Sequence, residues 1–374
     1  MEKKAHPIIK KMKESPKFSR FMVPIDESVD FRDAIYFLRD DGTFIFSEGY
    51  YHQIEKPREE RRINSHIFYV PRDPVNHGPD YTKKVLFGQD YENITKEFMI
   101  TQPLDKLYPL QLESYIKVDP SQRDMEKPLY ASYKAWAPLT SLVGCFPHRQ
   151  SLQAIMAMSD EDPSAKKIKI ITEQTAELLG IDISQIGVSG SLSLGTYANP
   201  HDIDFVIYGT AAEIARIVNF LYTLTDKEDK RKVYEFGKYW PIRFWDWAEG
   251  EKFMVCPFFS YIDPEEAPLR NWDCEDLGPC RVEARICDHT HNPFNPTILM
   301  LEDVKLDGKE CPDITRLIIH HGAERGDWRE GYRVSVKGHH VRVKTYSVVD
   351  GKREPKEEFE AVLEDNLGDV KRIE

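Results

Sequence analysis

The sequence predicts an α+β fold in three parts: an N-terminal α+β region, a central mixed sheet with helices, and a small C-terminal β-barrel-like domain. Three observations lead to this prediction. The length of 374 residues exceeds that of one ordinary domain. A helix, two strands around a glycine turn, and a second helix follow one another in mid-chain, and short alternating strands come later. We place the parts at 1–155, 156–265 and 266–374.

The composition indicates an acidic globular protein. Hydrophobic residues make up 41% of the chain, enough for a packed core, and the net charge of −12 argues against a surface coated with positive charge. No apolar run is long enough to cross a bilayer, and the polar N-terminus does not resemble a signal peptide. The six cysteines form no C-x-x-C pair, which fits reduced thiols. We expect a cytoplasmic protein with no membrane partner and leave its oligomeric state open.

The N-terminal part begins with a predicted β-hairpin. Residues 31–38 and 43–48 are apolar or alternating, and Asp41 and Gly42 between them are typical of a tight turn. A further strand is expected at 66–70. The stretch 71–150 is rich in proline, tyrosine and charge and has no clear period.

The central part begins with a predicted helix over 160–180. Pro163 suits its first turn, Asp160 or Asp162 is the expected cap, and Gly180 is placed to end it. The elements expected next are strands at 185–189 and 203–208, a helix over 211–224, and strands near 241–245 and 253–260.

The C-terminal part alternates strictly in several short runs. The strands expected there are 281–287, 297–301, 314–319, 331–337 and 340–347. Five short strands in so short a stretch predict a small barrel, with the OB type as one form. Pro355 is expected to open a short helix through Phe359, Val362 and Leu363.

The segment with the clearest chemistry starts at Gly190 and Ser191, directly after an apolar strand. Glycine permits a sharp turn and lets a ligand approach the backbone closely. The first N–H groups of a following short helix and the Ser191 hydroxyl then favour an anion, of which phosphate is the natural example. Gly195 would permit close packing or a second turn.

Asp202 and Asp204 open the next apolar strand. Residues two apart in a strand project to the same side, so the two carboxylates should converge while Ile203 and Phe205 face the opposite layer. Carboxylate oxygens suit Mg²⁺ or Mn²⁺. Such ions activate an attacking hydroxyl and neutralise a leaving pyrophosphate.

The arrangement G-S-x-x-x-G followed by D-x-D resembles the polymerase-beta-like nucleotidyltransferase superfamily. Gly190, Ser191, Gly195, Asp202 and Asp204 carry the resemblance. The runs RDAIYFLRDDGTFIFSEGYYH and RVEARICDHTHNPFNPT make the whole chain similar to a group of predicted, largely archaeal nucleotidyltransferases. The resemblance implies Gly190, Ser191 and Gly195 as nucleotide-binding residues and Asp202 and Asp204 as catalytic metal ligands.

The resemblance also implies a third carboxylate on a later strand, and the best-placed strand does not supply one. Met254 or Cys256 stands where the acid is expected. The substitutes that the sequence offers are Asp246, Glu251, Glu283 and Asp288.

Two further groups have a functional and a plain interpretation. Cys274, Cys280 and Cys287 lie near His289 and His291, but their spacing is not that of usual zinc-ligand pairs, and buried thiols with surface histidines are favoured. Basic residues alternate with aromatic ones in the C-terminal strands, which fits a nucleic-acid-binding face or an ordinary solvated sheet equally well. They are Arg281, Arg285, Arg316, Arg333, Lys337, Arg342 and Lys344, with Trp328, Tyr332 and Tyr346.

The sequence thus predicts a metal-dependent enzyme that moves a nucleotidyl group from a nucleoside triphosphate to a hydroxyl acceptor. RNA, another polynucleotide, a protein side chain and a small molecule are all acceptors it allows. The alternative is a catalytically impaired nucleotide- or RNA-binding module of the same fold. A protein without any ligand at the motif is the least favoured hypothesis.

Overall fold

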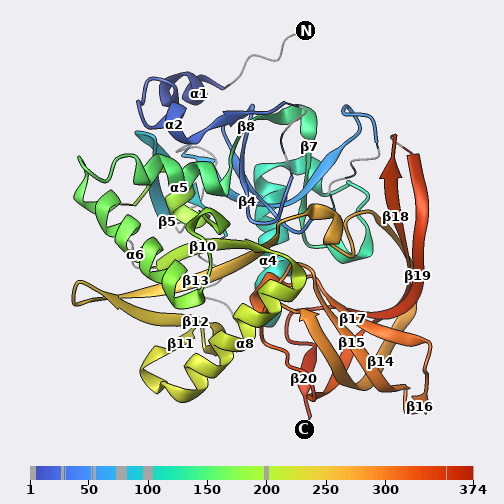
Figure 1. Cartoon of the computed structure of the whole chain (residues 1–374). Helices are drawn as coiled ribbons and strands as arrows, with labels where there is room; N and C mark the ends of the chain where they lie inside the picture. Colours follow the sequence, from blue (N-terminus) through green and yellow to red (C-terminus); the bar gives the residue numbers. More distant parts are fainter. Residues whose placement is uncertain are drawn as a thin grey trace. The chain divides into compact units, whose positions relative to one another are not determined.

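The computed structural model describes residues 6–26, 29, 31–51, 53, 56–72, 82–95, 104–197, 202–350 and 352–373. They form mostly strands, in three mixed or antiparallel sheets, with fewer helices (Figure 1). The predicted α+β class is therefore confirmed. The chain divides into two compact units, unit 1 (Met1–Ser47, His66–Ile100 and Ser141–Ile262) and unit 2 (Glu48–Ser65, Thr101–Thr140 and Asp263–Glu374). No described helix has the length and apolar character needed to cross a bilayer.

The first sheet orders its strands β1-β8-β2-β3-β4-β6-β5, and β7 pairs with the beginning of β4. Its strands are β1 (Val23–Pro24), β2 (Tyr36–Arg39), β3 (Phe44–Ser47), β4 (Arg62–Pro71), β5 (Thr82–Leu86), β6 (Gln89–Asn93), β7 (Ala135–Pro138) and β8 (Leu142–Phe146). Strands β2 and β3 form the predicted hairpin, and Gly42 adopts a φ of 84° in its turn, which glycine tolerates best.

The second sheet carries the motif and has the order β11-β12-β13-β10-β9. Its strands are β9 (Ile186–Val188), β10 (Asp202–Gly209), β11 (Lys232–Glu235), β12 (Lys238–Ala248) and β13 (Glu251–Tyr261). Strands β10 and β13 run parallel and the other neighbours antiparallel. The expected strands of this part are all present.

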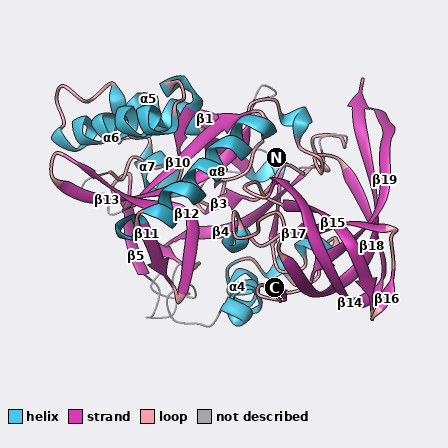
Figure 2. Cartoon of the chain, turned by 60° about the horizontal axis from the view of Figure 1, so that its bottom comes forward, coloured by secondary structure: helices cyan, strands magenta, loops and turns pink. Residues whose placement is uncertain are grey.

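Helices accompany this sheet, and all of them except the first are predicted from the sequence (Figure 2). They are α5 (His148–Met156), α6 (Pro163–Leu179), α7 (Gly190–Ser193) and α8 (Ala211–Lys227). Asp162 caps α6 by accepting hydrogen bonds from the N–H groups of Ser164 and Ala165, and Gly180 ends it in the left-handed conformation. Thr210 and Glu213 form a capping box at the start of α8.

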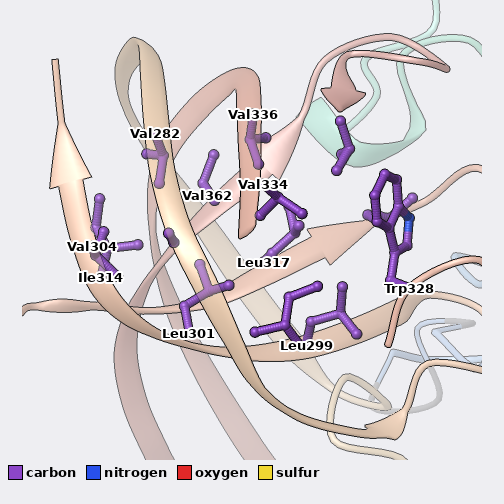
Figure 3. Close-up of a cluster of buried hydrophobic side chains, with 14 residues drawn as sticks. Val282, Leu299, Leu301, Val304, Ile314, Leu317, Trp328, Val334, Val336 and Val362 are labelled. Atoms are coloured by element: carbon purple, nitrogen blue, oxygen red, sulfur yellow. The ribbon is translucent and has the colours of Figure 1, made fainter. Parts of the chain in front are cut away.

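The third sheet lies in unit 2 and orders its strands β14-β15-β17-β19-β18-β20, with β16 paired to β15 and a further pairing of β14 with β18. The strands are β14 (Trp272–His291), β15 (Thr297–Leu306), β16 (Lys309–Glu310), β17 (Ile314–Ile319), β18 (Arg333–Val349), β19 (Lys352–Glu364) and β20 (Val370–Arg372). Valine, leucine and isoleucine side chains with Trp328 fill its core (Figure 3).

The short helix predicted from Pro355 is wrong, because these residues belong to β19. Phe359, Val362 and Leu363 have a helix-like spacing, but β19 lies between β17 and β18 in the sheet. Ala361, Val362 and Leu363 are consecutive and all buried. A strand inside a sheet covered on both faces hides its period of two, so spacing alone misleads.

The remaining helical segments are short apart from α4. They are α1 (Pro7–Met12), α2 (Phe18–Phe21), α4 (Leu104–Val118) and the 3₁₀ turns Pro120–Gln122, Leu129–Ala131, Leu139–Ser141, Ile183–Gln185, Asp229–Arg231, Pro264–Glu266 and Gly322–Glu324.

Candidate metal and nucleotide site

The two aspartates of the motif lie at the start of β10, as the sequence predicts. Asp202 is exposed and Asp204 half-buried, while Ile203 and Phe205 between and after them are fully buried. This alternation places both carboxylates on one face of the sheet. A carboxylate oxygen from each lies within 4.8 Å of the other.

A third donor joins them from the neighbouring strand. Cys256 in β13 is the direct parallel partner of Asp204, and its Sγ lies within 4.8 Å of both carboxylates. Its side chain is 3% exposed. Burial raises the pKa of the Cys256 thiol well above its usual range, although Arg243 opposes the rise. The sequence left Met254 or Cys256 at the position of the expected third acid, and the structure places Cys256 beside the two aspartates.

The glycine turn touches the same carboxylate. Gly190 has a φ of 56°, and a β-carbon added to it would lie only 2.9 Å from Asp204 Cγ. Any other residue would therefore collide with the Asp204 side chain and would be strained as well. The backbone fixes this approach, because the Ser189 N–H donates to the Asp204 carbonyl oxygen at 2.8 Å.

The other motif residues play distinguishable parts. Ser191 is half-buried in the first turn of α7, next to Gly190. Ser193 Oγ donates to the Gly190 carbonyl at 2.9 Å and so holds the turn. Gly195 has a φ of 68°, and an added β-carbon would lie 3.3 Å from the Phe21 ring. Its position fits the close packing that the sequence allowed.

Two buried tyrosines of the first sheet, Tyr36 and Tyr69, lie within electrostatic range of the aspartates and were not expected from the sequence. Burial raises the pKa of Tyr36 and Tyr69, and the negative charges of Asp204 and Asp202 raise both further. Both phenols therefore keep their protons and remain hydrogen-bond donors. Because they come from β2 and β4, far from β10 in the sequence, no local pattern would reveal them.

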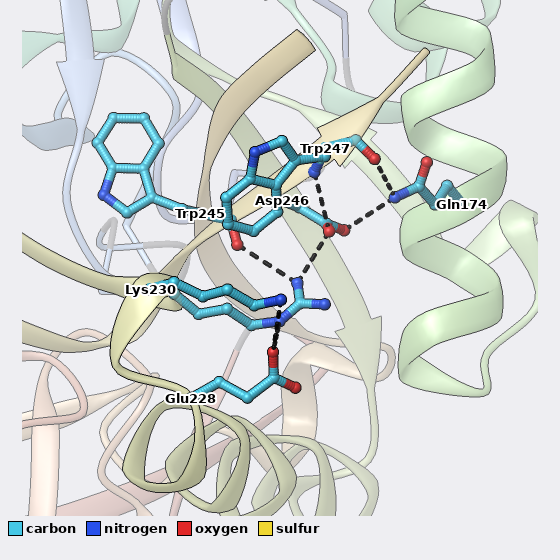
Figure 4. A network of polar contacts seen from close by, with 7 residues as sticks. Gln174, Glu228, Lys230, Trp245, Asp246 and Trp247 are labelled. Atoms are coloured by element: carbon cyan, nitrogen blue, oxygen red, sulfur yellow. Dashed lines mark hydrogen bonds and ion pairs between the residues drawn. The ribbon is translucent and has the colours of Figure 1, made fainter. Parts of the chain in front are cut away.

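Asp246 does not supply a third acid, because the fold already uses it (Figure 4). Its Oδ1 accepts from Arg231 at 2.8 Å and its Oδ2 from Gln174 at 3.1 Å. Glu251 is exposed and pairs with Lys167. Glu283 and Asp288 lie in β14 of unit 2. Over the residues that the structure describes, the only group of three potential metal ligands is Asp202, Asp204 and Cys256.

Aromatic and basic side chains continue the face that carries the aspartates. Met254 pairs with Asp202 on one side and with Trp245 on the other, so Trp245 projects to the same face. Lys252 Nζ lies 3.9 Å from the centroid of the Trp245 ring. The sequence analysis did not single out this row of side chains.

In the C-terminal strands, many of the predicted basic residues are in ion pairs. Arg285 pairs with Glu302, Arg316 with Glu357, and Arg342 with Glu275 and Glu360. The cysteines and histidines near 274–291 form no group of three potential ligands among the described residues. The ion pairs agree with the plainer interpretation of the basic residues. The expected buried thiols and surface histidines are wrong in detail, because Cys274, Cys280, Cys287, His289 and His291 are all half-buried.

The loop Asn199-Pro200-His201, which leads into the aspartate pair, lies outside the described residues. Comparisons with protein-family models, with curated proteins and with solved structures found no match to this chain.

Proposed function

We propose that this protein is a divalent-metal-dependent nucleotidyltransferase that moves a nucleotidyl group from a nucleoside triphosphate to a hydroxyl acceptor. One observation carries the proposal: two carboxylates and a thiol converge beside a turn where only glycine fits. The donors fit a cation, because the buried Cys256 thiol has no hydrogen-bond partner among the described residues and points into the group.

Asp202 and Asp204 would hold a divalent cation, and carboxylates considered alone suit Mg²⁺ or Mn²⁺. A divalent ion there would neutralise phosphate charge and favour ionisation of the acceptor hydroxyl. The chain contributes position and charge. Gly190 leaves room for the Asp204 carboxylate, the exposed Asp202 opens the group to solvent, and Ser191 offers a hydroxyl to phosphate oxygens.

The order of elements supports the family that the motif resembles. Strand β9, the short α7, strand β10 and helix α8 follow one another as that resemblance implies. In unit 2, β14 pairs with both β15 and β18, and these connect through β17 and β19, which supports the small C-terminal barrel. We keep a nucleic-acid acceptor held by these strands as a proposal. The six free cysteines fit a reducing compartment such as the cytoplasm.

The proposal is tested by replacing one metal ligand. Asp204→Asn should reduce pyrophosphate release and label transfer from an α-labelled triphosphate at least about a hundredfold, because an amide is a poor ligand of similar size. The acceptors to screen are RNA, DNA, protein and small hydroxyl compounds. Asp229→Asn, at an exposed aspartate paired with Lys232, is the matched control and should keep full activity. An active Asp204→Asn enzyme would contradict the proposed role.

The thiol where an acid is expected favours a second candidate, a module that binds a triphosphate without transferring it. Calorimetry with Mg²⁺ and each triphosphate separates the two. Binding without pyrophosphate release on every acceptor would identify the module, and release would identify the enzyme.

A further inference from the structure

The sulfur of Cys256 is placed by pairing that is independent of the motif. Strands β10 and β13 run parallel in continuous register from Asp202 opposite Met254 to Gly209 opposite Tyr261. Directly paired residues project to the same face of a sheet, so Cys256 must share the face of Asp204. A slip of one residue would instead turn Val255 or Pro257 toward the carboxylates.

The surroundings of this thiol differ from those of an ordinary core cysteine. Cys145 in β8 is also buried, at 1% exposure, but it belongs to no group of potential ligands among the described residues. Cys256 is equally buried, yet its sulfur faces two carboxylates. It forms no disulfide and has no hydrogen-bond partner in the part of the chain that the structure describes. The sulfur therefore stands where a cation held by the two carboxylates would meet a third donor.

We infer that Cys256 is a ligand, and that with Asp202 and Asp204 it makes a site selective for thiophilic divalent cations such as Zn²⁺ or Co²⁺ over Mg²⁺. Mg²⁺ prefers oxygen donors, whereas sulfur favours zinc and the later transition metals. Two carboxylates and one sulfur leave a coordination position for water or substrate, as catalytic zinc sites do. The inference rests on the metal-binding half of the proposed function and not on the transfer reaction.

The test uses the full chain, freed of metal with a chelator and titrated with Co²⁺ and with Cd²⁺. A metal–sulfur bond gives a charge-transfer absorption that oxygen ligands do not give. The wild-type protein should develop this band with one cation per chain. Cys256→Ser should lose that band, whereas Cys145→Ser, the matched buried control, should keep it.

Selectivity is measured in the same titrations. Cys256→Asp restores an all-oxygen donor set, so Mg²⁺ should compete with Co²⁺ at least about tenfold better in this variant than in the wild type. Asp204→Asn should weaken Co²⁺ binding by at least about tenfold. Circular dichroism and thermal unfolding show whether each variant is folded, and Cys256→Ala provides a second test if the serine variant is not.

The outcomes separate this inference from the transfer reaction. A folded wild-type protein without the band, or a band that persists in both Cys256→Ser and Cys256→Ala, would overturn the role of Cys256. Mg²⁺-dependent transfer in a protein without the band would leave the proposed function intact. A band that depends on Cys256 without any transfer would support the metal site and refute the enzyme.

Discussion

Two groups of acidic residues show how differently one chain can treat carboxylates. In unit 1, Asp202 and Asp204 stand on an open strand end, with Asp202 exposed and a thiol as their neighbour. In unit 2, Glu324 and Glu364 are each 5% exposed, and Glu324 accepts hydrogen bonds from the Trp328 indole at 3.1 Å and from the Gly368 N–H at 2.9 Å. Glu324 is satisfied by the protein itself, whereas Asp202 and Asp204 converge with Cys256 as a bound cation would need them.

The difference teaches how to tell a structural acid from one kept for binding. A buried acid whose oxygens accept from indole and backbone donors contributes to folding, and its removal leaves those donors unpaired. Two aspartates that converge on one face repel each other, and a bound cation would remove that repulsion. Variants of Asp202 and Asp204 should change ligand binding, and variants of Glu324 and Glu364 should change stability.

The largest expected effect comes from Glu324→Ala. It leaves the buried Trp328 indole and the Gly368 N–H without their acceptor, so the free energy of unfolding should fall by about 2–5 kcal/mol. Urea denaturation measures this change in the free energy of unfolding. Glu358→Ala removes an acid that is 54% exposed and paired with Lys344 at 3.6 Å, and it should cost less than about 1 kcal/mol. An equal loss of unfolding free energy in the two variants would show that the buried Glu324 matters no more to stability than an exposed glutamate.

Gly190→Ala tests the aspartate group, as Glu324→Ala tests the buried glutamates. Its β-carbon would displace the Asp204 carboxylate, so cation binding should be lost and unfolding should become easier by about 1–3 kcal/mol. Gly180→Ala is a matched control, because Gly180 has a similar φ of 63° but no neighbouring atom within 4 Å. It should cost about 1 kcal/mol and leave cation binding unchanged. Unchanged binding in Gly190→Ala would show that Asp204 is not needed in its present position.

The smallest expected effect is in the pH dependence of stability. Burial raises the pKa of Glu364 well above its usual range, and the charge of Glu324 raises it further. The stability that the protonated acid contributes is complete below the unfolded-state pKa of about 4.3 and is lost as pH rises through the folded-state pKa.

Glu364→Gln, which resembles the protonated acid, should remove this alkaline loss. Across the titration of Glu364, the free energy of unfolding of the wild type should fall relative to the variant by up to about 1.4 kcal/mol per pH unit. Urea denaturation at a series of pH values measures the difference. Parallel curves for the two proteins would show that Glu364 does not titrate as its burial implies.

Many helices and turns of unit 1 could be predicted because short stretches of sequence determine them. Asp162 caps α6, Gly180 ends it, Gly42 turns the first hairpin, and Asp202 and Asp204 share a face by strand geometry alone. Each depends on neighbours only a few residues away in the sequence.

The rest depends on pairing between distant segments. The register of β10 with β13 brings Cys256 to Asp204, and no short pattern encodes a parallel register. Tyr36 and Tyr69, whose pKa values the aspartates raise, belong to another sheet. The spacing in β19 suggested a helix because both faces of its final residues are buried, Val362 in one core cluster and Ala361 and Leu363 in another, which hides the alternation.

The contact between Gly190 and Asp204 also limits the order in which this site can change over generations. While position 204 is an aspartate, every substitution of Gly190 adds a β-carbon that collides with the Asp204 carboxyl group, so Gly190 cannot be replaced. Shortening position 204 would free the space and make larger residues at 190 tolerable. Loss of the site would therefore be hard to reverse. Asp204 would be replaced first, and once position 190 carries a larger residue, an aspartate regained at position 204 would no longer fit.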